Sequence, residues 1–220
     1  MLRTGLPKGR LLPRSEAAVT AYGEIAGDMP ARHRFLRMPD IPDLVAEGLL
    51  DVGIAGEEWL VDSGADVVRV APLCWYHVRI CALHLPGSAP QDGPVRVVSE
   101  YPRIAHDFGR ARWGEDFSLR TVRGSVEHYL PDLADVAVEC VETGESMRRK
   151  GLVATETLFE ADVWMVCSHG TARDGAVMDR LKRWAEAVAL DRPPGHESVA
   201  ISAAIPRPGA ITVSALNGRH

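Results

Sequence analysis

The sequence predicts an α/β fold divided into two lobes. Short apolar runs alternate with helical patterns along most of the chain, which is typical of parallel strands joined by crossover helices. The clearest linker, PGSAPQDGP at residues 86–94, separates two such series. We therefore expect a first lobe of residues 1–85 with 170–220, a second lobe of residues 86–169, and a cleft between the two αβ lobes. Ligands in such folds bind at the C-terminal ends of strands.

Each lobe is expected to hold its own strands and helices. In the first series we expect strands at residues 2–6, 33–38, 51–56, 66–74 and 78–85, and helices at 11–27, 40–50 (capped by Asp40) and 57–64. In the second we expect strands at 95–102, 117–122, 135–141 and 162–168, and helices at 103–114, 125–133 and after Gly144. Residues 173–190 show the clearest amphipathic helical period, and the apolar runs in 191–220 predict a hairpin or edge pair.

The composition is that of an ordinary globular protein. Of its 220 residues 46% are hydrophobic and 25% are charged, and the formal net charge is −5 with no dominant basic stretch. We therefore expect no general affinity for nucleic acid, and no apolar run approaches the roughly 20 residues that span a bilayer. The cysteines form no C-x-x-C pair and the histidines no H-x-x-x-H pattern with a matching acid, so no protein-bound metal site is predicted. A cytoplasmic location without membrane contact is expected.

The stretch VAVECVETGESMRRKGL, residues 136–152, places an acid inside an apolar run. Glu139 lies near the C-terminal end of the predicted strand, where an uncompensated buried carboxylate is costly, so it should reach the cleft or pair with a cation. A helix is predicted to begin in the following turn, Glu142-Thr143-Gly144-Glu145-Ser146. The first amides of that helix and the two hydroxyls form a cradle for a phosphate. An acid for ribose hydroxyls beside a phosphate cradle is how a phosphoribosyl donor can be held, although an ordinary helix cap at Thr143 explains the turn equally well.

A second group of candidates follows the strands of the first series. In LPKGR, Lys8 and Arg10 flank Gly9, where a backbone can approach a ligand closely, and Arg37 ends the next strand. The third strand end contributes Gly53, Gly56 and Glu57. The alternatives are a solvated basic turn and first-turn acids, Glu57 and Glu58, that complement a helix dipole.

Four blocks of the sequence, taken in order, resemble one known family. They are LRTGLPKGRL, FLRMPDIPDLVAEGLLDVGIAGEEWL, VRVVSEYPRIA and GSVEHYLPDLADVAVECVETGESMRRKGL. They resemble the catalytic chain of ATP phosphoribosyltransferase, the first enzyme of histidine biosynthesis, in its short form, over about residues 1–168. The resemblance implies a two-lobed fold like that of the type II periplasmic binding proteins.

The resemblance also implies roles for particular residues. Glu139 stands where the family usually has Asp, and Thr143, Gly144 and Ser146 stand in its T-G-x-T phosphate loop. Lys8, Gly9 and Arg10 match the turn on the pyrophosphate side, and Arg37 matches the arginine before D-I-P. Glu127 and Tyr101 match positions near the nucleotide, where the tyrosine ring can pack against a purine. The chain departs from the family pattern at Asp132, Glu139, Ser146 and Lys150.

The implied reaction is attack by adenine N1 of ATP on C1 of phosphoribosyl pyrophosphate, with pyrophosphate leaving. Adenine N1 already carries a lone pair, so no general base is expected, and Lys8, Arg10 and Arg37 are the candidates that stabilise charge on the leaving group. Mg²⁺ is expected to bridge donor oxygens and to be bound mainly through substrate phosphates. The resemblance further implies a homodimer and a regulatory subunit related to histidyl-tRNA synthetase.

Two other functions fit the same residues. The first is a paralogous phosphoribosyltransferase that uses another nitrogen heterocycle as acceptor, which the altered loop residues suggest. The second is a two-lobed module that binds a ligand without turnover. The cations at Lys8, Arg10 and Arg37 argue against the second, because a binder has no need of a pyrophosphate grip.

Overall fold

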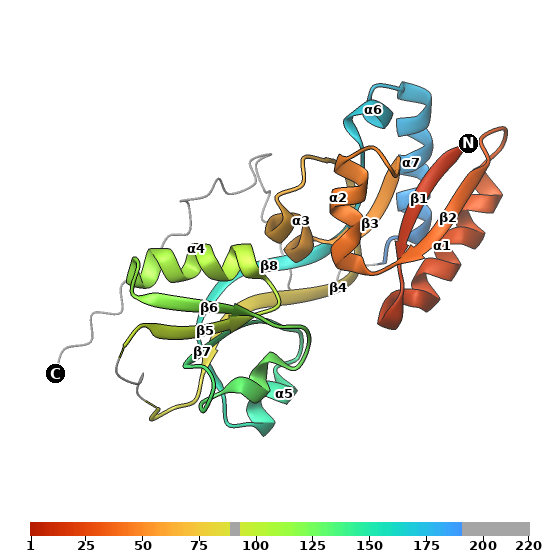
Figure 1. Ribbon diagram of the computed structural model, residues 1–220. Helices are drawn as coiled ribbons and strands as arrows, with labels where there is room; N and C mark the ends of the chain where they lie inside the picture. Colours follow the sequence, from red (N-terminus) through yellow and green to blue (C-terminus); the bar gives the residue numbers. More distant parts are fainter. Residues whose placement is uncertain (89–92, 191–220) are drawn as a thin grey trace. The chain divides into compact units, whose positions relative to one another are not determined.

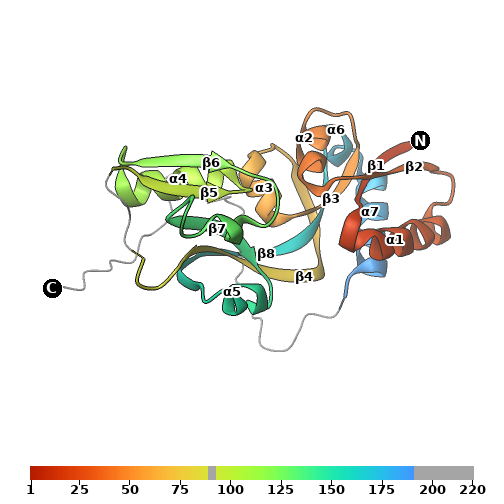
Figure 2. The ribbon, with the colours of Figure 1, turned by 60° about the horizontal axis from the view of Figure 1, so that its bottom comes forward.

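The computed structural model describes residues 1–88 and 93–190, and they form two αβ units (Figure 1). Unit 1 holds residues 1–77 and 161–190, and unit 2 holds residues 78–88 and 93–160. The chain passes from one unit to the other within two long strands, β4 (Val68–His84) and β8 (Val153–Cys167), which lie side by side in both ribbon views (Figures 1 and 2). The predicted lobes change at residues 85 and 170 instead, and their assignment stays a prediction.

Unit 1 is a sheet in the order β2-β1-β3-β8. Its strands are β1 (Leu2–Pro7), β2 (Ala31–Leu36), β3 (Val52–Gly56) and the end of β8. β1 is parallel to β2 and β3, and β8 is antiparallel to β3. Short helices η1 (Gly9–Leu11), η2 (Met38–Asp40), α2 (Ile41–Ala46) and α3 (Glu57–Ser63) follow the strand ends. The longer helices α1 (Leu12–Ile25) and α7 (Gly175–Val188) pack together, with α6 (His169–Ala172) before α7.

The contact between α1 and α7 is built on Trp184. Its side chain is fully buried, its indole N–H donates to the carbonyl of Ala18 at 2.8 Å, and its ring meets Tyr22 edge-on with centroids 4.8 Å apart. A buried indole needs such a hydrogen-bond partner to avoid a desolvation penalty. The sequence pattern that predicts an amphipathic helix at 173–190 is therefore confirmed, and its apolar face is the one that covers α1.

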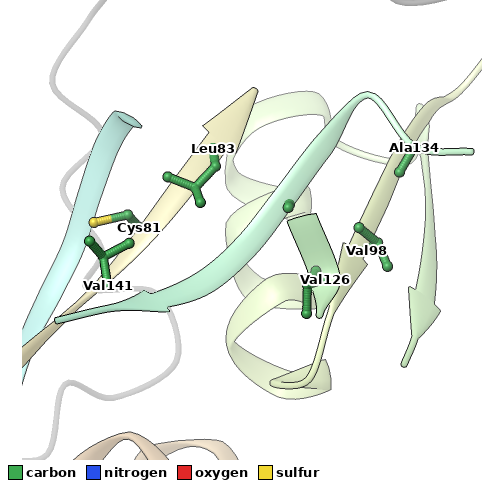
Figure 3. Close-up of a cluster of buried hydrophobic side chains, with 7 residues drawn as sticks. Cys81, Leu83, Val98, Val126, Ala134 and Val141 are labelled. Carbon is green, nitrogen blue, oxygen red and sulfur yellow. The ribbon is translucent and has the colours of Figure 1, made fainter. Parts of the chain in front are cut away.

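Unit 2 has the strand order β4-β7-β5-β6. β7 (Val136–Val141) is antiparallel to β4 and parallel to β5 (Val95–Ser99), and β5 is parallel to β6 (Phe117–Thr121). α4 (Pro102–Trp113) runs along β5 and β6 (Figure 1), while η3 (Val126–Tyr129) and α5 (Glu145–Arg149) flank β7. One apolar cluster joins β4, β5, β7 and η3; its labelled members in Figure 3 are Cys81, Leu83, Val98, Val126, Ala134 and Val141.

Three local expectations are wrong. The two strands expected at 66–74 and 78–85 are a single strand, β4 (Val68–His84), and Trp75 and Tyr76 at the expected break are buried. The strand expected at 162–168 begins at Val153, and α6 is an additional short helix. Asp40 stands before α2 but makes no capping hydrogen bond, because η2 leads directly into that helix. The hairpin expected in 191–220 lies outside the described residues.

The four cysteines of the chain are all free thiols. Within residues 1–88 and 93–190 there is no helix with the length and apolar character needed to cross a bilayer. A cytoplasmic location stays a prediction.

The tight packing of β3 against α2 predicts a large effect from one added methyl group. A Cβ at Gly53 would lie 2.5 Å from Ile41 Cγ2 and 2.9 Å from Val45 Cγ2, so Gly53→Ala should destabilise the fold by about 1–3 kcal/mol. Gly23 in α1 is the matched control, because a Cβ there meets nothing within 4 Å and alanine favours helix. Urea denaturation should show Gly23→Ala at or above wild-type stability; equal effects of the two changes would contradict this packing.

Candidate functional site

The predicted donor-binding residues converge on one cavity of unit 2. It has a volume of about 300 Å³ and is formed by the end of β7, the turn after it, the first turn of α5 and the segment around η3. Seven of the predicted substrate-binding residues line it: Glu127, Glu139, Glu142, Thr143, Gly144, Glu145 and Ser146. The prediction that the acid and the turn share a ligand site is thus consistent with their placement, while their contact with a substrate stays a prediction.

The turn after β7 takes its shape from Gly144. This residue has φ +72°, a left-handed conformation that glycine adopts without strain. The Thr143 hydroxyl accepts a hydrogen bond from the Glu145 N–H at 3.3 Å, which fixes the start of α5. The first amides of a helix have no carbonyl partner inside the helix, so they point out of its N-terminal end. The turn can therefore present N–H donors to an anion.

Glu139 is a partly buried acid with a pKa close to neutral pH. It lies opposite Cys81 in the β4–β7 ladder, and its Oε1 accepts the Cys140 N–H at 2.9 Å. Burial raises the pKa of Glu139 to about 7, and the nearby carboxylates Glu100 and Glu127 push it in the same direction, outweighing the Cys140 hydrogen bond. The charged groups that act on this pKa are acids, so the alternative of pairing with a structural cation is not what the geometry shows.

Glu127 has the opposite character. Burial alone would raise the pKa of Glu127, but its own backbone hydrogen bond, the Ser146 hydroxyl and the charge of Lys150 together hold the pKa below its usual value. The Ser146 hydroxyl donates to Glu127 Oε1 at 3.1 Å, and Lys150 Nζ lies 3.4 Å from the same oxygen. Two carboxylates of the cavity thus differ in character: the pKa of Glu127 is lowered, whereas the pKa of Glu139 is raised to about 7.

Unit 1 brings the predicted basic residues to one edge of its sheet. β1 and β2 are parallel with Pro7 opposite Leu36, so Lys8 and Arg37, the next residues of each strand, leave the sheet at the same edge. The Lys8 N–H donates to the Leu36 carbonyl at 2.8 Å, which ties the two strand ends together. Both side chains are exposed.

The same edge carries Gly9, Arg10 and Gly56. Gly9 has φ +76° and turns the chain into η1, and the exposed Arg10 guanidinium lies 4.7 Å from the centroid of the Tyr76 ring. Gly56 ends β3, where a Cβ would collide with the Tyr76 hydroxyl and the Glu58 carboxylate. The predicted grouping of basic turn and glycine strand end is therefore present within unit 1.

Two predicted site residues, Glu57 and Tyr101, are buried and bonded within the fold. Glu57 is 6% exposed and forms an ion pair with Arg69, which agrees with its alternative interpretation as a first-turn acid of α3. Tyr101 is 3% exposed and its N–H donates to Ser99 Oγ at 2.9 Å. A ring so deeply buried offers almost no face to a purine, so substrate contact by either residue stays a prediction that this structure does not favour.

The structure also adds residues to the site that sequence reasoning did not select. Ser125 lines the cavity in a left-handed conformation with φ +50°, an unusual backbone state for serine. Glu100 accepts the N–H of Gly124 and acts on Glu139. Lys150, which the sequence marks only as a departure from a family pattern, is the cation next to Glu127.

Comparison with known proteins matches this architecture to one family. The family model for ATP phosphoribosyltransferase matches residues 37–188. The chain belongs to the ATP phosphoribosyltransferase family. Among its relatives, ATP phosphoribosyltransferase of Geobacillus kaustophilus is 30% identical over 82% of this chain and 95% of its own length, and that of Deinococcus deserti is 31% identical over 78% and 85%.

Other relatives are longer than this chain. ATP phosphoribosyltransferase of Chlorobium phaeovibrioides is 25% identical over 79% of this chain but only 66% of its own length. The resemblance to the short form agrees with the near-complete match to the Geobacillus protein. The family's reaction joins phosphoribosyl pyrophosphate and ATP to give phosphoribosyl-ATP, the first step of histidine biosynthesis, so the predicted pentosyltransferase activity is confirmed. The match gives no support to a different acceptor or to a module without turnover.

Solved structures confirm the fold. The ATP phosphoribosyl transferase (HisG:HisZ) complex from Thermotoga maritima has a chain that aligns with a TM-score of 0.76, at 20% identity, over 86% of this chain and 98% of that one. The periplasmic aliphatic sulphonate binding protein SsuA from Escherichia coli aligns with a TM-score of 0.53 at 13% identity, over 85% and 68%. At these identities the likeness shows fold alone, and that fold is the expected two-lobed, periplasmic-binding-protein type.

The raised pKa of Glu139 predicts how stability changes with pH. Between about pH 4.5 and 7 the folded chain keeps a proton on Glu139 that the unfolded chain has lost, so stability falls as pH rises through this window. Glu139→Gln removes this effect and keeps the acceptor for the Cys140 N–H. The variant should match wild type near pH 4 and exceed it by about 1–3 kcal/mol at pH 8.

Chemical denaturation at both pH values measures the difference. Glu58, whose pKa burial also raises to about 7, titrates in both proteins and cancels from the comparison. A difference between variant and wild type that does not change with pH would contradict the assignment.

Proposed function

We propose that the cavity of unit 2 binds the phosphoribosyl donor. The turn at residues 143–146 receives the 5-phosphate, and Glu139 accepts hydrogen bonds from the ribose hydroxyls. The observation that supports this most is the convergence of the α5 amides, two hydroxyls and a titrating carboxylate on one cavity of about 300 Å³. Phosphate oxygens need donors and sugar hydroxyls need acceptors, and this cavity offers both side by side.

Donor binding would rearrange the contacts of Ser146 and Glu139. In the free chain the Ser146 hydroxyl donates to Glu127, and a phosphate oxygen is a competing, more strongly charged acceptor for it. Hydroxyls that donate to Glu139 favour its ionised form, which lowers its pKa when the donor is bound. A carboxylate that titrates near neutrality can thus be neutral when the cavity is empty and charged when it is occupied.

We propose that Lys8, Arg10 and Arg37 act on the pyrophosphate end of the donor. Adenine N1 attacks C1 through its own lone pair, so proton removal is not needed before the bond forms. The bond from C1 to the pyrophosphate oxygen breaks, and negative charge accumulates on the leaving group. Exposed cations gathered at one sheet edge are suited to stabilise such charge.

We propose that Mg²⁺ takes part through the substrate phosphates. Within residues 1–88 and 93–190 no group of three or more His, Cys, Asp or Glu side chains is arranged to hold a metal ion. The Glu127 and Glu139 carboxylates are close enough to interact electrostatically and can contact a hydrated ion that the donor carries. The ion would neutralise pyrophosphate charge when bound.

Assembly with other subunits is also proposed. The structural neighbour from Thermotoga maritima is a HisG:HisZ complex, so we propose that this chain forms a homodimer and associates with a regulatory subunit of the same kind. A chain related to histidyl-tRNA synthetase is the partner that the family resemblance implies.

Removing one cation should slow the chemical step. Arg37→Ala should lower kcat by about 10²–10³-fold, because charge stabilisation in the transition state is lost while the fold is untouched at this exposed position. Arg32→Ala is the control: the residue is also exposed, but it lies near the N-terminal end of β2, away from the edge that carries Lys8 and Arg37. Pyrophosphate release is the assay. Turnover of Arg37→Ala within about threefold of wild type would remove Arg37 from the leaving-group role.

A further inference from the structure

Tyr76 and Glu58 form a buried polar pair in unit 1. Tyr76 in β4 is 7% exposed, and Glu58 in the first turn of α3 is 2% exposed. The Tyr76 hydroxyl donates to Glu58 Oε1, and Met38 Sδ lies 3.4 Å from the same hydroxyl. The other oxygen, Glu58 Oε2, is buried and makes no hydrogen bond with any described residue. A buried carboxylate with an unsatisfied oxygen weakens a fold, so its presence calls for a functional explanation.

This pair lies next to Arg10. The Arg10 guanidinium is 4.7 Å from the centroid of the Tyr76 ring, within the range of a cation–π contact. The positive charge of Arg10 also lowers the pKa of Glu58, although burial dominates and raises that pKa to about 7. The Tyr76 hydroxyl and the backbone hydrogen bond of Glu58 itself also lower this pKa, and Glu57, which is paired with Arg69, raises it. Arg10, Tyr76 and Glu58 therefore form one connected chain from the surface to the interior.

The backbone next to the pair leaves room for it because residue 56 is glycine. A side chain at Gly56 would overlap both the Tyr76 hydroxyl and the Glu58 carboxylate, and the Gly56 N–H contacts Met38 Sδ at 3.2 Å. Cys74, two residues before Tyr76, has φ +53°, which is strained for a residue with a side chain. Such a backbone conformation persists only where the surrounding structure holds it.

We propose that Tyr76 and Glu58 are positioning residues for phosphoribosyl transfer: the ring orients the Arg10 guanidinium, and Glu58 fixes the ring through its hydroxyl. An exposed arginine has many rotamers, and a stacked ring reduces them before charge develops on the pyrophosphate. The inference rests on the proposed role of Arg10.

A double-mutant cycle tests this coupling. Arg10→Ala, Tyr76→Met and the double variant are compared for kcat and for KM of phosphoribosyl pyrophosphate. Methionine fills much of the ring volume but cannot stack on a guanidinium. We expect Tyr76→Met to lower kcat about tenfold or more, with KM changed by less than about threefold, because the contact matters in the transition state. In the Arg10→Ala background the same change should have no further effect on kcat.

A milder variant covers the case in which Tyr76→Met does not fold. Tyr76→Phe keeps the ring and removes only the link to Glu58. It should lower kcat about threefold when Arg10 is present and leave kcat unchanged in the Arg10→Ala enzyme. Thermal denaturation confirms that each variant is folded at the assay temperature.

The outcomes separate the two proposals. If Arg10→Ala slows turnover but the Tyr76 changes have no effect, or reduce kcat equally in both backgrounds, the positioning role is wrong and the role of Arg10 stands. If Arg10→Ala leaves kcat unchanged, the leaving-group role of Arg10 is wrong and the positioning role falls with it. A tyrosine that serves the fold alone gives equal reductions in both backgrounds.

Discussion

The free energy of burying the Glu139 carboxylate is the constraint on which the donor site depends. An apolar strand end next to other acids makes ionisation unfavourable, so the pKa rises to about 7. A glutamine or an apolar residue would suit the empty cavity better. The acid becomes favourable when hydroxyl donors arrive, and ribose supplies such donors. Glu139 thus lowers the stability of the free chain, and its carboxylate gains hydrogen-bond donors only when the donor's ribose is bound.

The two units use the same local device for different chemistry. In unit 2 the strand β7 ends in a glycine-shaped turn that starts α5, and this places amides and hydroxyls around an acid. In unit 1 the parallel register of β1 and β2 places Lys8 and Arg37 at one edge, and Gly56 ends β3 at that edge as well. Donors for a phosphate and cations for a leaving group both follow from where strands end.

Sequence reasoning predicts the parts of the site that are local. The run VAVECVETGES contains the strand, the acid and the turn within a few residues, and its pattern alone places them together. The basic turn is found in the same way. What sequence cannot show is the pairing of distant residues: the Tyr76 hydroxyl in β4 bonds Glu58 in α3, and Lys150, just after α5, lies beside Glu127 in η3. The burial of Tyr101, which removes its ring from a purine, likewise depends on packing in three dimensions.

The most direct test of the account is donor binding as a function of pH. Calorimetry should measure phosphoribosyl pyrophosphate binding to wild type and to Glu139→Gln at pH 6 and pH 8, with Mg²⁺ present. Relative to the variant, which reports the donor's own titration, wild-type affinity should rise by about tenfold between the two values as Glu139 ionises. Identical pH dependence in the two proteins would show that the Glu139 carboxylate does not hold the donor.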